Sequence, residues 1–176
     1  MLFRSRGGAY RPFSIHRLRG SVSGDGRIDA WDHRIVGQSI LRDAGFNLPE
    51  DRIDKTLIEG AANLPYDIPN LHVDVHQPSA AVPVLWWRSV GHTQNAFSTE
   101  VFFDELAHAA GRDPLELRLA LLADDPRRRA VLEMAAAAAG WGTPLPAGRG
   151  RGIAVHYSFK TWVAEVAEVT VKDDKS

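Results

Sequence analysis

Alternating apolar and polar positions predict strands in the first part of the chain. Residues 13–22 and 27–36 flank Ser23-Gly24-Asp25-Gly26, a short connection with two glycines that can take positive φ, and this arrangement is typical of a β-hairpin. Residues 71–76 alternate in the same way and predict another strand. The intervening residues 37–70 have no strong periodicity, although a short helix fits within residues 51–59.

The middle of the chain follows a helical spacing instead. Apolar residues three and four positions apart predict a helix that packs one face against a core. These residues are Phe97, Val101, Phe102, Leu106 and Ala109. Gly111 follows them and is placed to end the helix.

Two acid–proline pairs predict further helix starts. Asp113-Pro114 and Asp125-Pro126 each place an N-cap acid before proline at the first helical position. The second pair leads into residues 127–139, a helix closed by Gly140.

The last part of the chain returns to strands. Residues 152–159 and 162–171 alternate, and the second strand is expected to be largely buried. The glycine-rich run at 148–152 is more typical of a tight entry into a strand than of a phosphate-binding loop, because it precedes a strand and lacks a Walker lysine. The order of strands, then helices, then strands predicts an α+β fold.

Composition narrows the classes of protein. The chain has 176 residues, 44% hydrophobic and 24% charged, with a formal charge of −1. This argues for a folded core and gives no electrostatic reason to expect nucleic acid or an anionic membrane as a partner. No apolar run approaches the length of a transmembrane helix. The absence of cysteine excludes a disulfide, a thiol nucleophile and a cysteine-ligated metal site in this chain.

Both ends of the sequence indicate a piece of something longer. Residues 1–9 have basic residues but no apolar signal region, and we interpret them as a truncated or non-native start. Residues 172–176 have turn composition directly after a strand, as in a hairpin cut in half. Residues 10–176 are therefore expected to be one partial domain.

The histidines offer only a weak metal-site hypothesis. His72 and His76 lie on one face of a predicted strand, and His16 and His33 can face each other across the hairpin. His92 stands alone, as does His108, and His156 lies in the last sheet. Without a convergent third ligand, polar residues on strand faces are the favoured interpretation. The adjacent acids Asp104 and Glu105 do not face one point on a helix, so a solvated or packing role is favoured for them.

The segment from Trp86 to Phe97 carries the strongest candidate site. Two tryptophans run into Arg88, then into a glycine-containing loop, then into the helix start. Such a loop is expected to present free backbone N–H groups, and Arg88 adds a fixed positive charge; both suit an anionic oxygen ligand. The alternative remains open: the tryptophans are core, Arg88 is solvated, and Gly91 only permits a turn.

At this segment the chain resembles the molybdopterin-binding large (beta) subunit of the xanthine dehydrogenase/aldehyde oxidase family, in its isoquinoline 1-oxidoreductase type. The resemblance rests on residues 87–97, 100–107 and 111–118, and it extends over nearly the whole chain after about residue 9. The main motif is Trp87-Arg88-Ser89-Val90-Gly91-His92-Thr93-Gln94-Asn95-Ala96-Phe97.

The resemblance implies part of a molybdenum hydroxylase. It implies a molybdenum–molybdopterin cofactor, in bacterial members usually the cytosine dinucleotide form, and hydroxylation of an aldehyde or N-heteroaromatic with water as the oxygen source. Electrons would pass to iron–sulfur clusters on a small partner subunit. The fold implied is a fragment of the molybdopterin-binding domain, with an N-terminal hairpin, central helices and a C-terminal strand pair.

The resemblance also assigns roles to single residues. Arg88, Ser89 and Gly91 match the loop that holds the cofactor. Val90 matches a position that lines the substrate pocket, where the xanthine-oxidising branch often has an aromatic residue. The family's Gly-Gly-Gly-Phe-Gly loop is expected upstream of Tyr10, and its base glutamate, in a Gly-Glu-Pro segment, beyond Ser176. This chain alone is therefore expected to be inactive.

A non-catalytic module that keeps the fold for protein–protein interaction, for instance docking an iron–sulfur partner, is the alternative. Both interpretations predict that Trp86, Trp87 and the face formed by Phe97 and Val101 are packing residues. Coding sequence that continues from Ser176 into a Gly-Glu-Pro segment would favour the enzyme.

Overall fold

A computed structural model describes residues 8–172. Residues 1–7 and 173–176 lie outside the described part, and with them most of the expected truncated start and of the expected final turn. The elements follow one another as β1 (Ser14–Val22), β2 (Ile28–Gly37), α1 (Ile40–Asp43), the 3₁₀ turn η1 (Lys55–Leu57), β3 (Asn70–His76), α2 (His92–Ala109), α3 (Pro114–Leu121), α4 (Pro126–Ala138), β4 (Arg149–Ser158) and β5 (Thr161–Thr170). This order confirms the predicted α+β class. None of the helices described here is long and apolar enough to cross a membrane.

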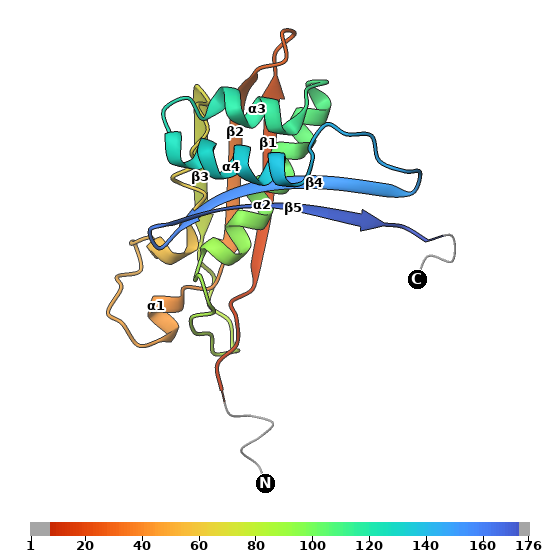
Figure 1. The fold of residues 1–176 in the computed structure, drawn as a ribbon. Coiled ribbons are helices and arrows are strands. Elements are labelled where there is room, and N and C mark those ends of the chain that lie inside the picture. The colour runs from red at the N-terminus through yellow and green to blue at the C-terminus, as the bar shows by residue number, and fades with distance from the viewer. Residues whose placement is uncertain (1–7, 173–176) are drawn as a thin grey trace.

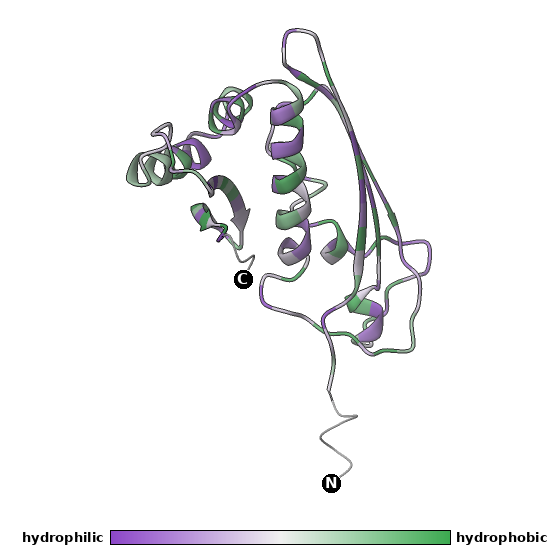
Figure 2. Ribbon diagram, turned by 90° about the vertical axis from the view of Figure 1, so that its right-hand side faces the viewer, coloured by the Kyte–Doolittle hydropathy of each residue, from purple (hydrophilic) through white to green (hydrophobic). Residues whose placement is uncertain are grey.

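The elements form three layers (Figure 1). One layer is a sheet of order β1-β2-β3, in which β1 and β2 form the predicted antiparallel hairpin and β2 pairs with β3 in parallel. Helix α2 lies between this sheet and the antiparallel β4–β5 hairpin (Figure 2). Helix α4 packs against both strands of that hairpin, and α3 contacts α2 and α4. Figure 2 places α2 as the central layer, with one side of it toward each sheet.

Helix α2 lies very close to β1 at Gly20. A Cβ atom at Gly20 would lie 2.9 Å from Leu106 Cδ2, tighter than real contacts allow. Because glycine has no Cβ atom, the helix can pack closely against β1 at this point. Trp31 and Ile35 of β2 are buried on the sheet, and Trp31 meets Phe102 of α2 edge-on at 4.8 Å between ring centroids.

The predicted helix caps are confirmed. The Asp113 side chain accepts hydrogen bonds from the N–H groups of Leu115 and Glu116, and Asp125 accepts one from Arg128 N–H. Gly111 and Gly140, which follow α2 and α4, have φ of 63° and 62°, the left-handed conformation common after a helix end. The short helix expected within residues 51–59 is the 3₁₀ turn η1, whereas α1 was not predicted.

The predicted packing face of α2 is confirmed at Leu106, which is buried, and at Phe102, which packs against the core, but it is wrong at the exposed Phe97, Val101 and Ala109. Phe97 is 72% exposed and Val101 42% exposed, and Trp86 and Trp87 are also exposed. The helix instead buries a mixed face: Asn95, Ser98, Thr99, Glu100, Phe103, Leu106 and Ala107. Because hydrogen bonds within the fold satisfy most of these polar groups, a polar face can be buried at low cost.

The expectation of a largely buried last strand is also wrong. Val163 and Val169 of β5 are 46% and 60% exposed, while Ala164 and Val166 are partly buried. The reason is that β5 belongs to a two-stranded sheet with α4 covering one face. Arg127 of α4 lies over the Trp162 ring, 4.9 Å from its centroid.

A buried charged network joins the layers on one side of α2. The Arg118 guanidinium donates to Glu100 Oε2 from Nε at 3.0 Å and to Asp104 Oδ1 at 2.6 Å. Glu100 also accepts from the Tyr66 hydroxyl at 2.7 Å and from the Val155 N–H of β4 at 2.9 Å. Arg118 is fully buried and Glu100 is 7% exposed. Every oxygen of the Glu100 carboxylate therefore has a donor.

Burial and the Glu100 charge raise the pKa of Tyr66, so this hydroxyl keeps its proton and donates to the carboxylate. Burial lowers the pKa of Arg118, but the neighbouring charges of Glu100 and Asp104 raise it by more, and it stays charged. The network thus connects α2 and α3 through the ion pairs of Arg118 with Glu100 and Asp104, and the hydrogen bonds to Glu100 add β4 and the segment before β3.

We predict that Arg118→Leu destabilises the chain by about 3–5 kcal/mol, because the buried Glu100 charge loses its partner. Arg34→Leu is the matched control: Arg34 pairs with Asp74 at the surface, and its loss should cost at most about 1 kcal/mol. Urea unfolding followed by circular dichroism measures both. Equal losses for the two variants would show that the network does not hold the layers together.

Candidate functional site

The loop before α2 has an unusual backbone. Ser89 and Val90 have φ of 69° and 51°, in the left-handed region. A β-branched residue such as valine is rarely found there, and each such residue costs on the order of 1 kcal/mol or more. Strain of this kind persists only where the surroundings fix the loop, and it is frequent at functional sites.

Backbone hydrogen bonds use the N–H groups that were expected to be free. Val90 N–H donates to Trp87 O at 3.0 Å, His92 N–H to Ser89 O at 3.0 Å and Thr93 N–H to Val90 O at 3.3 Å. The Gly91 N–H lies close enough to the Glu59 carboxylate to lower the pKa of that group. The expectation of free N–H groups is wrong at Val90, His92 and Thr93, because carbonyl groups of the same tight turn accept their hydrogen bonds. An anionic ligand would therefore have to be bound by side chains and not by these backbone N–H groups.

Gly91 is required by packing, since the loop rests on the segment that contains η1. A Cβ atom at Gly91 would lie 1.7 Å from Thr56 O, which no side chain can tolerate. Asn95, one turn into α2, donates from Nδ2 to Leu57 O at 2.9 Å and to Glu59 O at 2.7 Å. Together these contacts lock the loop and the helix start onto residues 56–59.

Glu59 lies beneath this loop. Burial raises its pKa, and the hydrogen bond from Gly91 N–H lowers it by less, so the pKa ends above its usual range. Its Oε2 atom is buried without a hydrogen-bond partner in the described part of the chain.

A cavity of about 540 Å³ lies between this loop and the β4–β5 hairpin. It is lined by Arg88, Ser89, His92, Thr93 and Ala96 from the loop and α2, and by His156, Ser158, Phe159, Thr161 and Val163 from the β4–β5 hairpin. Arg88 is exposed, and Ser158 Oγ is buried without a hydrogen-bond partner among residues 8–172. Of the predicted site residues, the structure brings Arg88 and Ser89 to this cavity, whereas Val90 and Gly91 are not among its lining residues.

His92 does not stand alone, contrary to prediction. Its Nδ1 lies 2.8 Å from Nε2 of His156, and both rings line the cavity. The two residues are 64 positions apart, and no local pattern indicates that they meet. The expected meeting of His16 and His33 is confirmed, with Nδ1 of His16 2.8 Å from Nε2 of His33.

Both pairs are held in the neutral form. Burial, and then the neighbouring His92, lower the pKa of His156 to about 4, and burial lowers that of His92. Burial, and then His16, lower the pKa of His33 to about 4. Two neutral rings can share one N–H···N hydrogen bond, whereas two charged rings would repel. Among the residues described here, no group of three or more His, Asp or Glu side chains is arranged to hold a metal ion.

These pKa shifts predict a loss of stability in mild acid. An unfolded histidine takes up a proton near pH 6.5, whereas His33 and His156 in the folded chain do so only at about 4. The unfolded state therefore binds more protons between these values, and the free energy of unfolding falls as the pH is lowered from about 6.5 to about 4.

His156→Gln should reduce this pH slope by up to about 1.4 kcal/mol per pH unit. His76→Gln, at an exposed position on β3, is the control and should leave the slope unchanged. Thermal or urea unfolding at several pH values between 4 and 7.5 provides the measurement. A slope that His156→Gln does not alter would contradict the pKa assignment.

The packing of the loop generates a second prediction. Gly91→Ala places a methyl group on Thr56 O and should displace the loop or destabilise the chain by about 3 kcal/mol or more. Gly24→Ala is matched to it, because a Cβ at Gly24 meets nothing within 4 Å, and it should be nearly neutral. Thermal unfolding compares the two, and equal melting temperatures would contradict the close contact.

Comparison with known proteins places this site in a family context. The family model of the molybdopterin cofactor-binding domain matches residues 7–122, which include the loop and α2. A nicotinate dehydrogenase chain of Pseudomonas putida is 36% identical over 127 residues, covering 61% of this chain and 10% of that protein. The beta chain of isoquinoline 1-oxidoreductase from Brevundimonas diminuta is 33% identical over 108 residues, covering 59% and 14%. The chain thus spans only about a tenth to a seventh of the length of these relatives.

Solved structures share the fold. Aldehyde oxidoreductase from Desulfovibrio gigas matches 87% of this chain and 18% of its own, with a TM-score of 0.59 and 20% identity. Quinoline 2-oxidoreductase from Pseudomonas putida 86 matches 84% of this chain and 21% of its own, with a TM-score of 0.56 and 18% identity. The match of the family model to most of the chain shows that it belongs to the molybdopterin cofactor-binding domain family.

Proposed function

We propose that this chain forms one wall of the cofactor site in a large subunit of a molybdenum hydroxylase. The observation that carries the proposal is the position of Arg88 and Ser89. Both lie within the region that matches the cofactor-binding family, and both line the cavity of about 540 Å³.

The side chains around this cavity fit a polar, anionic cofactor. Arg88 offers a forked set of donors with a fixed charge. The hydroxyls of Ser89 and Ser158 add neutral donors, and the buried Ser158 Oγ has no hydrogen-bond partner among residues 8–172. In this proposal Arg88 and Ser89 contact the cofactor. Gly91 acts by fixing the loop, since its backbone packs directly on the Thr56 carbonyl. Val90 presents its side chain toward the substrate.

The bound molybdenum–molybdopterin cofactor would supply the redox chemistry that hydroxylates a substrate with oxygen from water. Residues of this chain would bind and orient it. The strained turn at Ser89 and Val90 fixes the direction of the loop, and Phe159 and Val163 give the cavity an apolar wall. Such an environment excludes water from one side of the site.

The whole protein to which this chain would belong would act on an aldehyde or an N-heteroaromatic compound, in line with the names of the relatives. The pterin is the cytosine dinucleotide form, and electrons leave to iron–sulfur clusters on a small subunit. The relatives' names designate subunits of larger assemblies, and a chain without cysteine holds no cluster ligands of the usual kind. Residues 10–176 form part of one domain.

A non-catalytic role is the second candidate, because Trp86 and Trp87 are 42% and 58% exposed. Exposed tryptophans are enriched at protein interfaces. In that case the chain would dock a partner subunit through this surface without holding a cofactor.

The test is Arg88→Gln in a complete large subunit that carries this segment. We predict a loss of molybdenum content and of hydroxylation of isoquinoline or benzaldehyde by about tenfold or more, because a charge-assisted contact to the cofactor is lost. Arg149→Gln, at an exposed position on β4 outside the cavity, is the control. Metal analysis and dye-coupled turnover give the readouts, and full molybdenum occupancy in Arg88→Gln would overturn the assignment.

The 176-residue chain by itself should neither retain the cofactor stoichiometrically nor turn over substrate. Stoichiometric molybdenum binding with hydroxylation by the purified chain would contradict this part of the proposal.

A further inference from the structure

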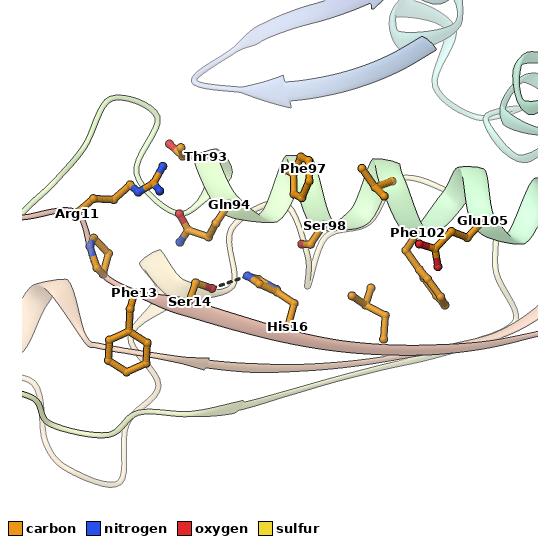
Figure 3. Close-up of a pocket in the computed structure, with 13 residues that line it drawn as sticks. Arg11, Phe13, Ser14, His16, Thr93, Gln94, Phe97, Ser98, Phe102 and Glu105 are labelled. Carbon is orange, nitrogen blue, oxygen red and sulfur yellow. Dashed lines mark hydrogen bonds between the residues drawn. The ribbon is translucent and has the colours of Figure 1, made fainter. Parts of the chain in front are cut away.

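A second, larger cavity lies on the opposite side of α2 from the β4–β5 hairpin. It is a groove of about 890 Å³ between β1 and α2, in the range of small-molecule sites. Figure 3 shows side chains reaching into it from the segment before β1, from β1 and from α2. Its lining is Arg11, Pro12, Phe13, Ser14, His16, Leu18, Thr93, Gln94, Phe97, Ser98, Val101, Phe102 and Glu105.

One end of this groove is polar and carries hydrogen-bond donors. Arg11 and Gln94 lie near each other there, with Arg11 directed toward the start of α2 (Figure 3). The Gln94 Nε2 atom is buried and has no hydrogen-bond partner among residues 8–172. No carboxylate in the described part of the chain forms an ion pair with Arg11. A cation and a buried donor without acceptors form a natural site for an anionic oxygen group.

The neighbouring side chains of Ser14 and His16 at this end already have hydrogen-bond partners within the fold. Ser14 Oγ is hydrogen-bonded to Nε2 of His16, and Nδ1 of His16 lies 2.8 Å from His33 Nε2. Burial lowers the pKa of His16, so this ring adds no positive charge at neutral pH. Arg11 is therefore the one cation that lines the groove among residues 8–172.

The middle of the groove is apolar. Phe97 and Val101 are one helical turn apart on α2, and both are exposed. Leu18 of β1 and Phe102 of α2 also line this part of the groove. The apolar stretch is about one helical turn long, roughly 6 Å, which matches a fused two-ring aromatic system. Glu105 lies at the far end and disfavours a second negative charge there.

We propose that this groove binds a small aromatic carboxylic acid, with its carboxylate at Arg11 and Gln94 and its ring system against Phe97 and Val101. Charge complementarity selects a single carboxylate at one end, and the exposed aromatic wall selects a flat apolar body. The groove shares only Thr93 with the lining of the cavity at Arg88 and contains neither Arg88 nor Ser89, so binding here does not depend on the residues proposed to hold the cofactor.

The test is isothermal titration calorimetry of the purified chain with 1-naphthoate and with the uncharged 1-naphthalenemethanol. We expect naphthoate to bind at one site and the alcohol to bind about tenfold more weakly, because the alcohol lacks the charge-assisted contact. Arg11→Gln should weaken naphthoate by about tenfold and leave the alcohol unchanged. Phe97→Ala should weaken both ligands by about fivefold through loss of apolar contact.

Two matched controls accompany these variants. Arg17→Gln removes an exposed cation from β1 that does not line the groove, and Met134→Ala removes a 71% exposed apolar side chain from α4. Both should bind naphthoate as the unaltered chain does. Since Arg11 and Phe97 are exposed, their variants are expected to fold, which circular dichroism verifies. Absence of saturable naphthoate binding, or equal affinity in Arg11→Gln, would overturn the proposal. Full molybdenum occupancy in Arg88→Gln would contradict the proposed cofactor site, but it would not affect the proposal for this groove.

Discussion

The buried ion pair between Glu100 and Arg118 is the constraint on which the arrangement of this chain depends. A carboxylate and a guanidinium removed from water are tolerated only when both are paired and hydrogen-bonded. Here the Glu100 carboxylate meets Arg118 of α3, the Tyr66 hydroxyl and the Val155 N–H of β4. The β4–β5 hairpin and α3 must therefore meet α2 at one point.

This constraint determines which face of α2 is turned outward. With Glu100 directed inward, Phe97 and Val101 face away from the core and line cavities on the flanks of the helix. The helix start is fixed separately, because Asn95 holds the carbonyls of Leu57 and Glu59. The result is a central helix with a groove toward β1 on one flank and a cavity toward the β4–β5 hairpin on the other.

Local rules predicted the local features well. The hairpin turn, the acid caps at Asp113 and Asp125, and the glycines that end helices each depend on a few neighbouring residues, and the structure has them where the sequence placed them. The packing face of α2 was predicted correctly only at Leu106 and Phe102, since periodicity counts apolar residues and takes no account of a polar residue whose partners lie elsewhere. Glu100 meets a residue 18 positions away and another 55 away, and neither distance leaves a local signal. The same holds for His92 and His156, and for the parallel pairing of β2 with β3.

In the candidate loop, neighbouring residues of one motif have different structural roles. The resemblance picked out Arg88, Ser89, Val90 and Gly91 as one unit, and four adjacent residues would ordinarily be given one kind of role. The structure separates them: Arg88 and Ser89 line a cavity, whereas Gly91 is turned toward Thr56, where no Cβ atom fits. Because Gly91 lies so close to that carbonyl, the chain must reverse direction within the two residues before it, and these are the residues with positive φ. The strain at Ser89 and Val90 is thus the cost of anchoring the loop through Gly91, and it keeps Arg88 at the edge of the cavity.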